Sequence, residues 1–224
     1  MFQPPIIYKS NVFKSNAAGV LPYTVYQNKI YFLLGKENRG ISDFGGYKDH
    51  NEDDEQGASR EFSEETLGLF SESDRIRGCN LGVKNTTDIM TKLLKDKAMK
   101  ESGYVTSIIN GKNQYRMFIA PVSRWLENSD FEKMVKENDE RPYHRRIHCA
   151  EKDSICWLSI SDMLSLANDP DVTIKFNEFP QTLFKNFRFT ISQPEFITFL
   201  NNLSNIDTEP LQISIDKFWK SNLE

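Results

Sequence analysis

The 224-residue sequence is poor in cysteine and contains no long apolar run. Its three cysteines, Cys79, Cys149 and Cys156, are odd in number and lack the spacing of a metal or redox site. They predict a reducing, cytoplasmic environment in which they serve as small buried side chains rather than as disulfides. No apolar stretch reaches the ~20 residues needed to cross a bilayer, and no signal-peptide pattern opens the chain, so we expect no membrane partner.

An excess of positive charge is also absent. The formal net charge is −4, from 28 lysines and arginines against 32 aspartates and glutamates. This balance offers no electrostatic footprint for an extended nucleic acid, which binding proteins hold through clustered cations. The length suits one sizeable domain. We predict a single domain over 1–224, with an N-terminal extension at 1–16, an insertion at 70–103 and a C-terminal elaboration at 170–224.

Three carboxylates within the segment 45–69 stand out. Glu61, Glu64 and Glu65 are three and four residues apart, a spacing that places them on one face of a helix. Like charges so close repel one another and need a counter-charge. A bound divalent cation would supply it, and oxygen ligands favour Mg²⁺ or Mn²⁺. The alternative is an acidic helix face in solvent.

The same segment carries helix start and stop signals. Asp53 can cap the first turn together with Gln56, and Gly68 suits the left-handed residue that ends many helices. Gly57 lies inside the helix, which predicts close approach by a loop or a ligand. Arg60 lies beside the acidic face, where it could fix one carboxylate.

These residues resemble the Nudix box: a glycine, five residues, a glutamate, seven residues, Arg-Glu, an apolar residue, any residue, and Glu-Glu. The matching positions are Gly46, Glu52, Arg60, Glu61, Phe62, Glu64 and Glu65. Two features depart from the family pattern. The closing glycine, Gly68, comes one residue late, and Phe44 stands where the family commonly has a proline.

The resemblance implies an α+β fold, an α/β/α sandwich with a mixed sheet. It also implies a hydrolase that cleaves a nucleoside diphosphate linked to another group, such as ADP-ribose, a nucleotide sugar or a dinucleoside polyphosphate. By position, the metal ligands would be Glu61, Glu64, Glu65 and the carbonyl of Gly45. One of these glutamates, or a later one, would help to deprotonate the attacking water. Arg60 would orient Glu61, and Glu52 would support the junction of loop and helix.

Outside the box, Glu151 is the best further candidate for a metal ligand or base, with Asp153 behind it; both could instead be solvated loop acids. The basic segment RPYHRRIH at 141–148 includes Arg145 and Arg146, which could bind substrate phosphates. Lys48 is a similar candidate. A plain surface role is the alternative for all three, and the histidines show no zinc spacing.

Around the box, alternating apolar residues and turn signals predict two hairpins and a late strand–helix pair. The predicted strands are 17–25 and 29–35 around Gln27-Asn28, 104–109 and 114–122 around Asn110-Gly111, and 154–160, followed by a helix at 161–167. Residues 1–10 could add an edge strand. A helix at 87–101, with Met90, Leu93, Leu94 and Lys97 along one side, would be either a lid or a packed surface element.

The C-terminal region is dense in phenylalanine: Phe176, Phe179, Phe184, Phe187 and Phe189. Such residues are more often core or homodimer contacts than base-stacking sites. The substrate itself stays open, because the insertion displaces the proline and tyrosine positions that mark subfamilies. Three rivals remain: an mRNA-decapping enzyme, which needs a basic RNA track; a diphosphoinositol-polyphosphate hydrolase, which needs a dense basic pocket; and a non-catalytic binding module, which usually lacks a box glutamate.

Overall fold

The computed structural model describes residues 15–71, 80–148, 150–169, 171, 173–176 and 179–223. The edge strand predicted at 1–10 and the predictions for Cys79 and Cys149 lie outside these residues. Cys156 is half-buried, and burial raises the pKa of its thiol to about 12. Among the described helices, none is both long and apolar enough to pass through a lipid bilayer.

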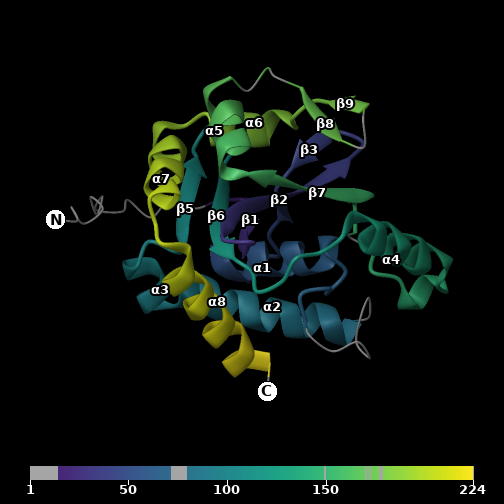
Figure 1. Cartoon of the computed structure of the whole chain (residues 1–224). Helices are drawn as coiled ribbons and strands as arrows, with labels where there is room; N and C mark the ends of the chain where they lie inside the picture. Colours follow the sequence, from purple (N-terminus) through teal and green to yellow (C-terminus); the bar gives the residue numbers. More distant parts are fainter. Residues whose placement is uncertain are drawn as a thin grey trace.

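A mixed sheet forms the centre of the molecule (Figure 1). Its strands are β1 (Ala17–Tyr26), β2 (Lys29–Glu37), β3 (Gly40–Ser42), β4 (Phe44–Tyr47), β5 (Thr106–Asn110), β6 (Tyr115–Pro121) and β7 (Ser154–Ser159). Strand β1 runs parallel to β6 and antiparallel to β2 and β4, while β7 pairs with β2. A separate hairpin joins β8 (Ile174–Phe176) to β9 (Phe179–Gln181).

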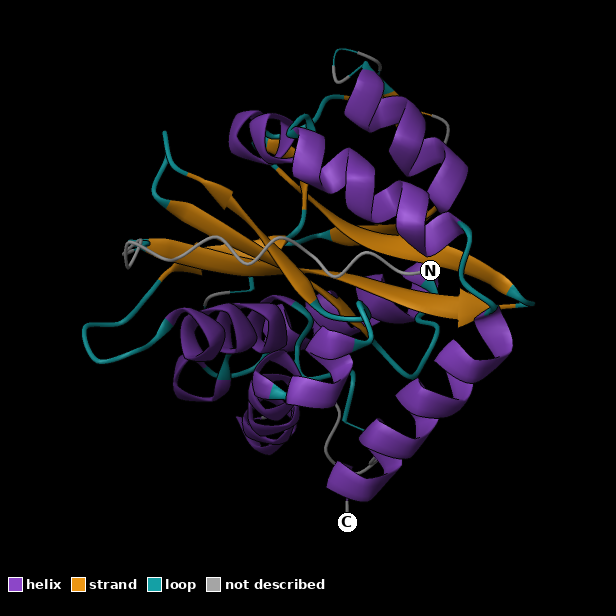
Figure 2. Cartoon of the chain, turned by 90° about the vertical axis from the view of Figure 1, so that its left-hand side faces the viewer, coloured by secondary structure: helices purple, strands orange, loops and turns teal. Residues whose placement is uncertain are grey.

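Helices cover both faces of this sheet (Figure 2). One layer contains α1 (Asp54–Glu65), α2 (Asn80–Lys95), α3 (Lys97–Glu101) and α8 (Thr208–Leu223), and the other contains α5 (Ile160–Asn168), α6 (Lys185–Ile191) and α7 (Pro194–Ser204). Helix α4 (Asn128–Glu140) packs beside β7, and the short 3₁₀ helix η1 (Tyr143–Arg145) follows it. This arrangement confirms the predicted α+β sandwich with a mixed sheet.

The central strand β1 is buried along most of its length because helices cover both of its faces. On the side of α1, Phe62 meets Phe44 of β4 with ring centroids 5.9 Å apart, and Phe70 at 5.1 Å. These contacts place one stripe of α1 in the core. The opposite stripe, which carries the acidic side chains, therefore faces away from it.

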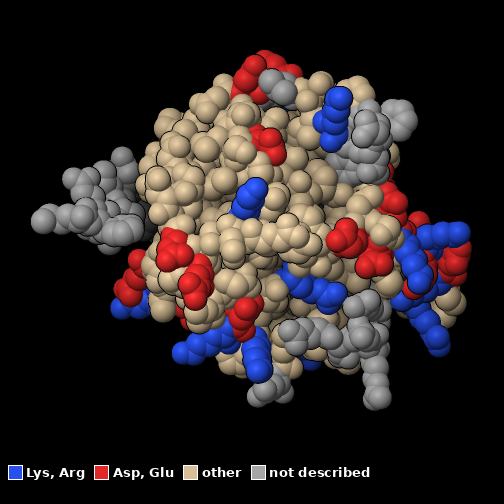
Figure 3. Space-filling model, in the orientation of Figure 1, with Lys and Arg blue, Asp and Glu red and all other residues tan. Residues whose placement is uncertain are grey.

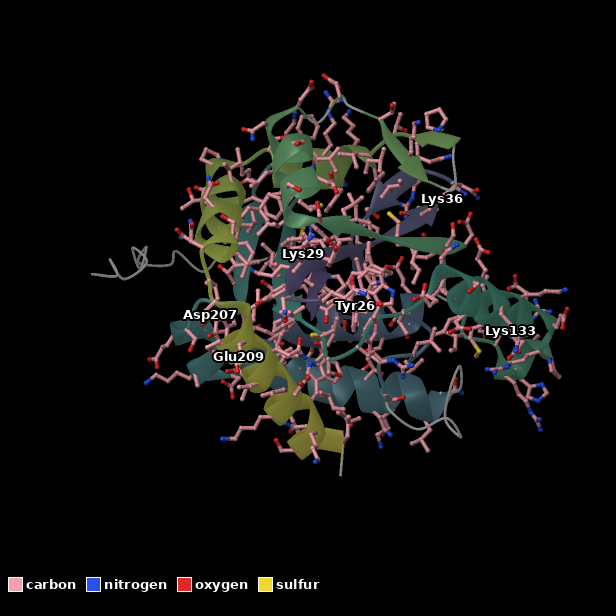
Figure 4. All side chains as sticks on the ribbon, in the orientation of Figure 1. Tyr26, Lys29, Lys36, Lys133, Asp207 and Glu209 are labelled. Carbon is pink, nitrogen blue, oxygen red and sulfur yellow. The ribbon has the colours of Figure 1, made fainter. Side chains whose placement is uncertain are left out.

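The first predicted hairpin is confirmed. Tyr26 and Lys29, labelled in Figure 4, pair across the turn, and Gln27 and Asn28 between them have φ of 49° and 57°. Two successive left-handed residues form the type I′ turn that suits the twist of a hairpin.

The second hairpin is present, but the turn predicted around Asn110-Gly111 lies one residue further along the chain. Asn110 belongs to β5 and pairs with Tyr115, so the loop spans 111–114 and Gln114 carries the positive φ of 50°. The side chain of Asn110 donates to the hydroxyl of Thr190 on α6. This tertiary contact uses the asparagine that the local pattern assigned to the turn.

The helix predicted at 87–101 is also different in extent. Helix α2 begins at Asn80, and Asp96 interrupts the pattern because its carboxylate accepts from the amide of Met99 and caps α3. Leu93 and Leu94 are fully buried, whereas the side chain of Lys97 is 87% exposed. Helix α2 is thus a packed element on α1, the second of the two interpretations of this segment.

Candidate functional site

The helix that carries the box glutamates is fixed at both ends. Asp53 and Gln56 form the predicted capping box at its start. After Glu65 the chain turns through Leu67 and Gly68, with φ of 55° and 67°, and the amide of Gly68 donates to Ser63 at 2.8 Å. The late glycine is therefore left-handed, as predicted, and the extra residue is absorbed by a second left-handed position at Leu67.

Arg60 is the centre of the acidic face. Its Nε donates to Glu52 Oε1 at 2.8 Å, and its Nη1 donates to Glu61 Oε1 at 2.8 Å and to Glu64 Oε2 at 3.0 Å. Its Nη2 donates to the carbonyl of Tyr47 at 2.8 Å. Although burial opposes its charge, these carboxylates hold the pKa of Arg60 above its ordinary value. One arginine thus joins three glutamates to strand β4.

Glycines allow strand β4 and the segment after it to pack closely against helix α1. A Cβ on Gly46 would lie 2.6 Å from Glu61 Oε2, so a side chain there would displace that carboxylate from its present position. A Cβ on Gly57 would lie 2.5 Å from Cγ of Lys48. The close approach predicted at Gly57 is therefore made by the loop before α1. Lys48 itself forms an ion pair with Asp54.

Glu65 is buried beneath strand β4, and only 2% of it is exposed. Its Oε2 accepts from the amide of Gly45 at 2.7 Å, and its Oε1 lies 3.5 Å from Nζ of Lys152. Burial raises the pKa of Glu65 to about 8, with Lys152 opposing the rise and Glu37 adding to it. Burial also raises the pKa of Glu61, against the opposing effect of Arg60.

The sequence did not reveal the role of Lys152, which is 2% exposed. Its Nζ lies 3.1 Å from Glu37 Oε1 and donates to Ser42 Oγ at 2.7 Å, while its Cδ would lie 2.7 Å from a Cβ on Gly35. The available signal was its place between Glu151 and Asp153, because alternate residues of an extended chain point to opposite sides. A charged residue between two solvent-facing acids is expected to point inward.

The two acids beside Lys152 face away from it. Glu151 is held by Arg39 at 2.8 Å, and Arg39 also pairs with Glu37 at 2.7 Å. Asp153 pairs on the surface with Lys36, labelled in Figure 4, at 3.1 Å. Glu151 therefore lies at the rim of the acidic site and Asp153 outside it.

Some of these groups line a cavity of about 390 Å³. Of the predicted site residues, Gly45, Glu61, Glu65 and Glu151 line it. The lining does not include Glu52, Glu64, Lys48, Arg145 or Arg146. Arg145 lies in the exposed turn η1 and Arg146 directly after it, so the structure does not bring these two side chains into the cavity.

A further buried acid, Asp43, lines the cavity. Asp43 accepts a hydrogen bond from the hydroxyl of Tyr115, and burial raises the pKa of Asp43 to about 6. Together with Glu37, Glu61 and Glu65, this residue makes the cavity floor rich in carboxyl groups. Lys152, Arg39 and Arg60 pair with these carboxyl groups.

Within the described ranges, no three His, Cys, Asp or Glu side chains are arranged to hold a metal ion. The contacts above explain this, because Arg60 engages Glu61 and Glu64 while Lys152 faces Glu65. The donor chemistry still fits a hard divalent cation, since these are all-oxygen ligands whose charges repel one another.

No protein-family model and no curated protein matches the chain. Among solved structures, a C. elegans Ap4A hydrolase in a binary complex is similar at 14% identity over 84% of this chain and 95% of that chain, with a TM-score of 0.39. A second C. elegans Ap4A hydrolase structure is similar at 16% identity over 85% and 96%, with a TM-score of 0.34. A MutT/Nudix family protein from Listeria innocua is similar at 14% identity over 89% and 97%, also with a TM-score of 0.34.

Proposed function

We propose that this chain is a Mg²⁺- or Mn²⁺-dependent pyrophosphohydrolase of the Nudix type. Its substrate would be a nucleoside diphosphate linked to another group, such as ADP-ribose, a nucleotide sugar or a dinucleoside polyphosphate. The observation that carries this proposal is the hydrogen bonding of Arg60 to Glu52, Glu61 and Glu64. It gathers the box residues beside a cavity large enough for part of a nucleotide.

The proposed cation site comprises Glu61, Glu64, Glu65 and the carbonyl of Gly45. The donor set fits because burial and neighbouring acids disfavour the ionised forms of Glu61 and Glu65, which a cation would favour. A divalent ion bound there would neutralise charge on the phosphate oxygens and lower the pKa of an attacking water.

The protein groups have distinct parts in the reaction. The water oxygen bonds to phosphorus while the bond from that phosphorus to the bridging oxygen breaks, so that two phosphate products form. A box glutamate, or Glu151 at the rim, takes the proton of the water. Arg60 holds Glu61 and Glu64 in place, and Glu52 fixes Arg60. Phosphoryl transfer depends mainly on such positioning and charge neutralisation.

The net charge of −4 favours a small substrate over a capped RNA. On the described part of the face in Figure 3, lysines and arginines are interspersed with acids, mainly over α4 and near α3, and form no continuous basic track. A decapping enzyme needs such a track because RNA phosphates bind through clustered cations.

The direct test is a panel of nucleotide substrates with Mg²⁺, applied to the intact protein, Glu64→Gln and Glu55→Gln. Glu55 is the matched control, because it lies on the same helix and pairs at its surface with Lys100. We expect Glu64→Gln to lose about a hundredfold or more in turnover, since metal charge stabilisation is worth several kcal/mol. Glu55→Gln should keep its turnover.

Equal turnover by all three proteins would refute the role given to Glu64. An intact protein that binds nucleotides without cleaving any would instead favour the binding-module alternative.

A further inference from the structure

One wall of the cavity comes from the C-terminal region, far along the chain from the box. The amide of Ile41 donates to the carbonyl of Thr182 at 2.9 Å, and the amide of Phe184 donates to the carbonyl of Ile41 at 2.8 Å. Gly40 permits this approach, since it has φ of 120° and a Cβ there would lie 2.6 Å from the Thr182 oxygen. The segment 182–187 is thus held against β3 by backbone hydrogen bonds.

The wall presents a stacked pair of flat groups. Phe184 is half-exposed and lines the cavity, and the guanidinium of Arg39 lies 4.9 Å from its ring centroid. Two carboxylates, Glu37 and Glu151, fix the guanidinium in this position. Nucleobases stack on aromatic rings and on guanidinium planes, so a base could extend this pair by one layer.

The wall also presents an amide pair. Asn113 Nδ2 donates to Asn186 Oδ1 at 3.0 Å, and both half-buried side chains line the cavity. No hydrogen-bond partner for Asn113 Oδ1 or Asn186 Nδ2 occurs among the described residues. An amide oxygen on Asn113 and an amide N–H on Asn186 are thus available to a ligand, and a base edge carries complementary donors and acceptors.

We propose that the wall of Phe184, Arg39, Asn113 and Asn186 binds the base of the nucleotide substrate. This inference rests on the proposed function, because it gives the group beyond the diphosphate a place in the same cavity. It also disfavours an inositol polyphosphate, which needs cations free to bind phosphates. The arginine of this wall is already paired with two carboxylates.

The test measures binding of AMP and of ribose 5-phosphate by calorimetry, so that the base contribution is separated from that of the sugar phosphate. The variants are Phe184→Ala, Asn186→Ala and, as matched control, Phe189→Ala. Phe189 lies on α6, the helix that carries Asn186 and begins directly after Phe184. It is 39% exposed and does not line the cavity. If Phe184→Ala fails to fold, Phe184→Leu keeps the apolar volume without the ring.

We expect Phe184→Ala to weaken AMP roughly 5- to 150-fold, the usual range for a lost base-stacking ring, and to leave ribose 5-phosphate unchanged. Asn186→Ala should also weaken the binding of AMP and not that of ribose 5-phosphate, and Phe189→Ala should weaken the binding of neither ligand. Equal affinity of the intact protein for the two ligands, or AMP binding that is indifferent to Phe184, would overturn the proposal.

The binding assay and the substrate panel can each refute one proposal and leave the other standing. Hydrolysis with AMP binding that does not depend on Phe184 would remove the base wall and keep the hydrolase. Phe184-dependent AMP binding without hydrolysis would remove the hydrolase and keep the base wall.

Discussion

At the scale of single residues, a buried lysine joins the acidic site to its rim. Lys152 lies between Glu37 and Glu65, and Arg39 continues the series from Glu37 to Glu151 at the surface. Acidic and basic side chains thus alternate from the exposed rim to the buried Glu65. Removing one member of such a series leaves its neighbours buried without a counter-charge.

The variant Lys152→Met tests this arrangement, because methionine keeps the apolar stem over Gly35 and removes the charge. We expect a loss of about 3–5 kcal/mol in the free energy of unfolding, measured in urea. The matched control is Lys36→Met, whose surface pair with Asp153 should contribute at most about 1 kcal/mol. Equal stability of the two variants would show that Lys152 does not balance the buried acids.

The residues that the sequence predicted and those that it missed differ in how they are brought together. Glu64 lies three residues after Glu61 and four after Arg60, so its spacing alone predicts contact with both. Arg39 and Lys152 reach the same site from segments far apart in the sequence, through the pairing of β2 with β7. No local pattern contains that pairing.

At the scale of elements, helix α1 ends against helix α2 through a backbone contact. A Cβ on Gly68 would lie 2.4 Å from backbone atoms of Gly82 and Val83, and Thr86 donates to the carbonyl of Gly68 at 3.3 Å. Helix α2 is thereby fixed to the end of the helix that carries the proposed site. Gly68 serves both the left-handed turn and this contact.

Comparing Gly68→Ala with Gly103→Ala separates the strain of the left-handed backbone from the steric contact with α2. Both glycines have positive φ, 67° and 74°, but nothing lies within 4 Å of a Cβ at Gly103. Gly103→Ala should therefore show only the left-handed strain of roughly 1–2 kcal/mol. Gly68→Ala should lose about 1–3 kcal/mol more in urea unfolding, because α2 must shift. Equal losses would mean that α2 does not press on Gly68.

Local patterns predicted most elements and failed where a tertiary contact overrode them. The Gln27-Asn28 turn, the capping box at Asp53 and the left-handed Gly68 each depend on neighbouring residues, and each is found. The side chain of Asn110 instead donates to the hydroxyl of Thr190, and the turn lies one residue later than predicted. The failure at 87–101 has a local cause, because Asp96 accepts from the amide of Met99 and begins a new helix there.

At the scale of the whole molecule, the sheet and its two helical layers bring distant segments to one cavity. Strand β4 at Gly45, helix α1, the rim at Glu151 and the C-terminal segment at Phe184 all line it. The phenylalanine-rich composition predicted core or dimer contacts, and Phe187 is indeed buried. Phe184 differs because the bridge between Ile41 and Leu183 places it at the cavity. Sequence could not predict a pairing across so long a separation.

The most direct test of the central claim is product analysis of a cleaved nucleotide in ¹⁸O-labelled water, with Mg²⁺ or with EDTA. Attack of water on a bridged phosphorus predicts two phosphate products, one of which carries a single ¹⁸O on its phosphate. EDTA should abolish the reaction, and excess Mg²⁺ should restore it. Cleavage that leaves the diphosphate bridge intact, or that proceeds equally in EDTA, would contradict a metal-dependent pyrophosphohydrolase.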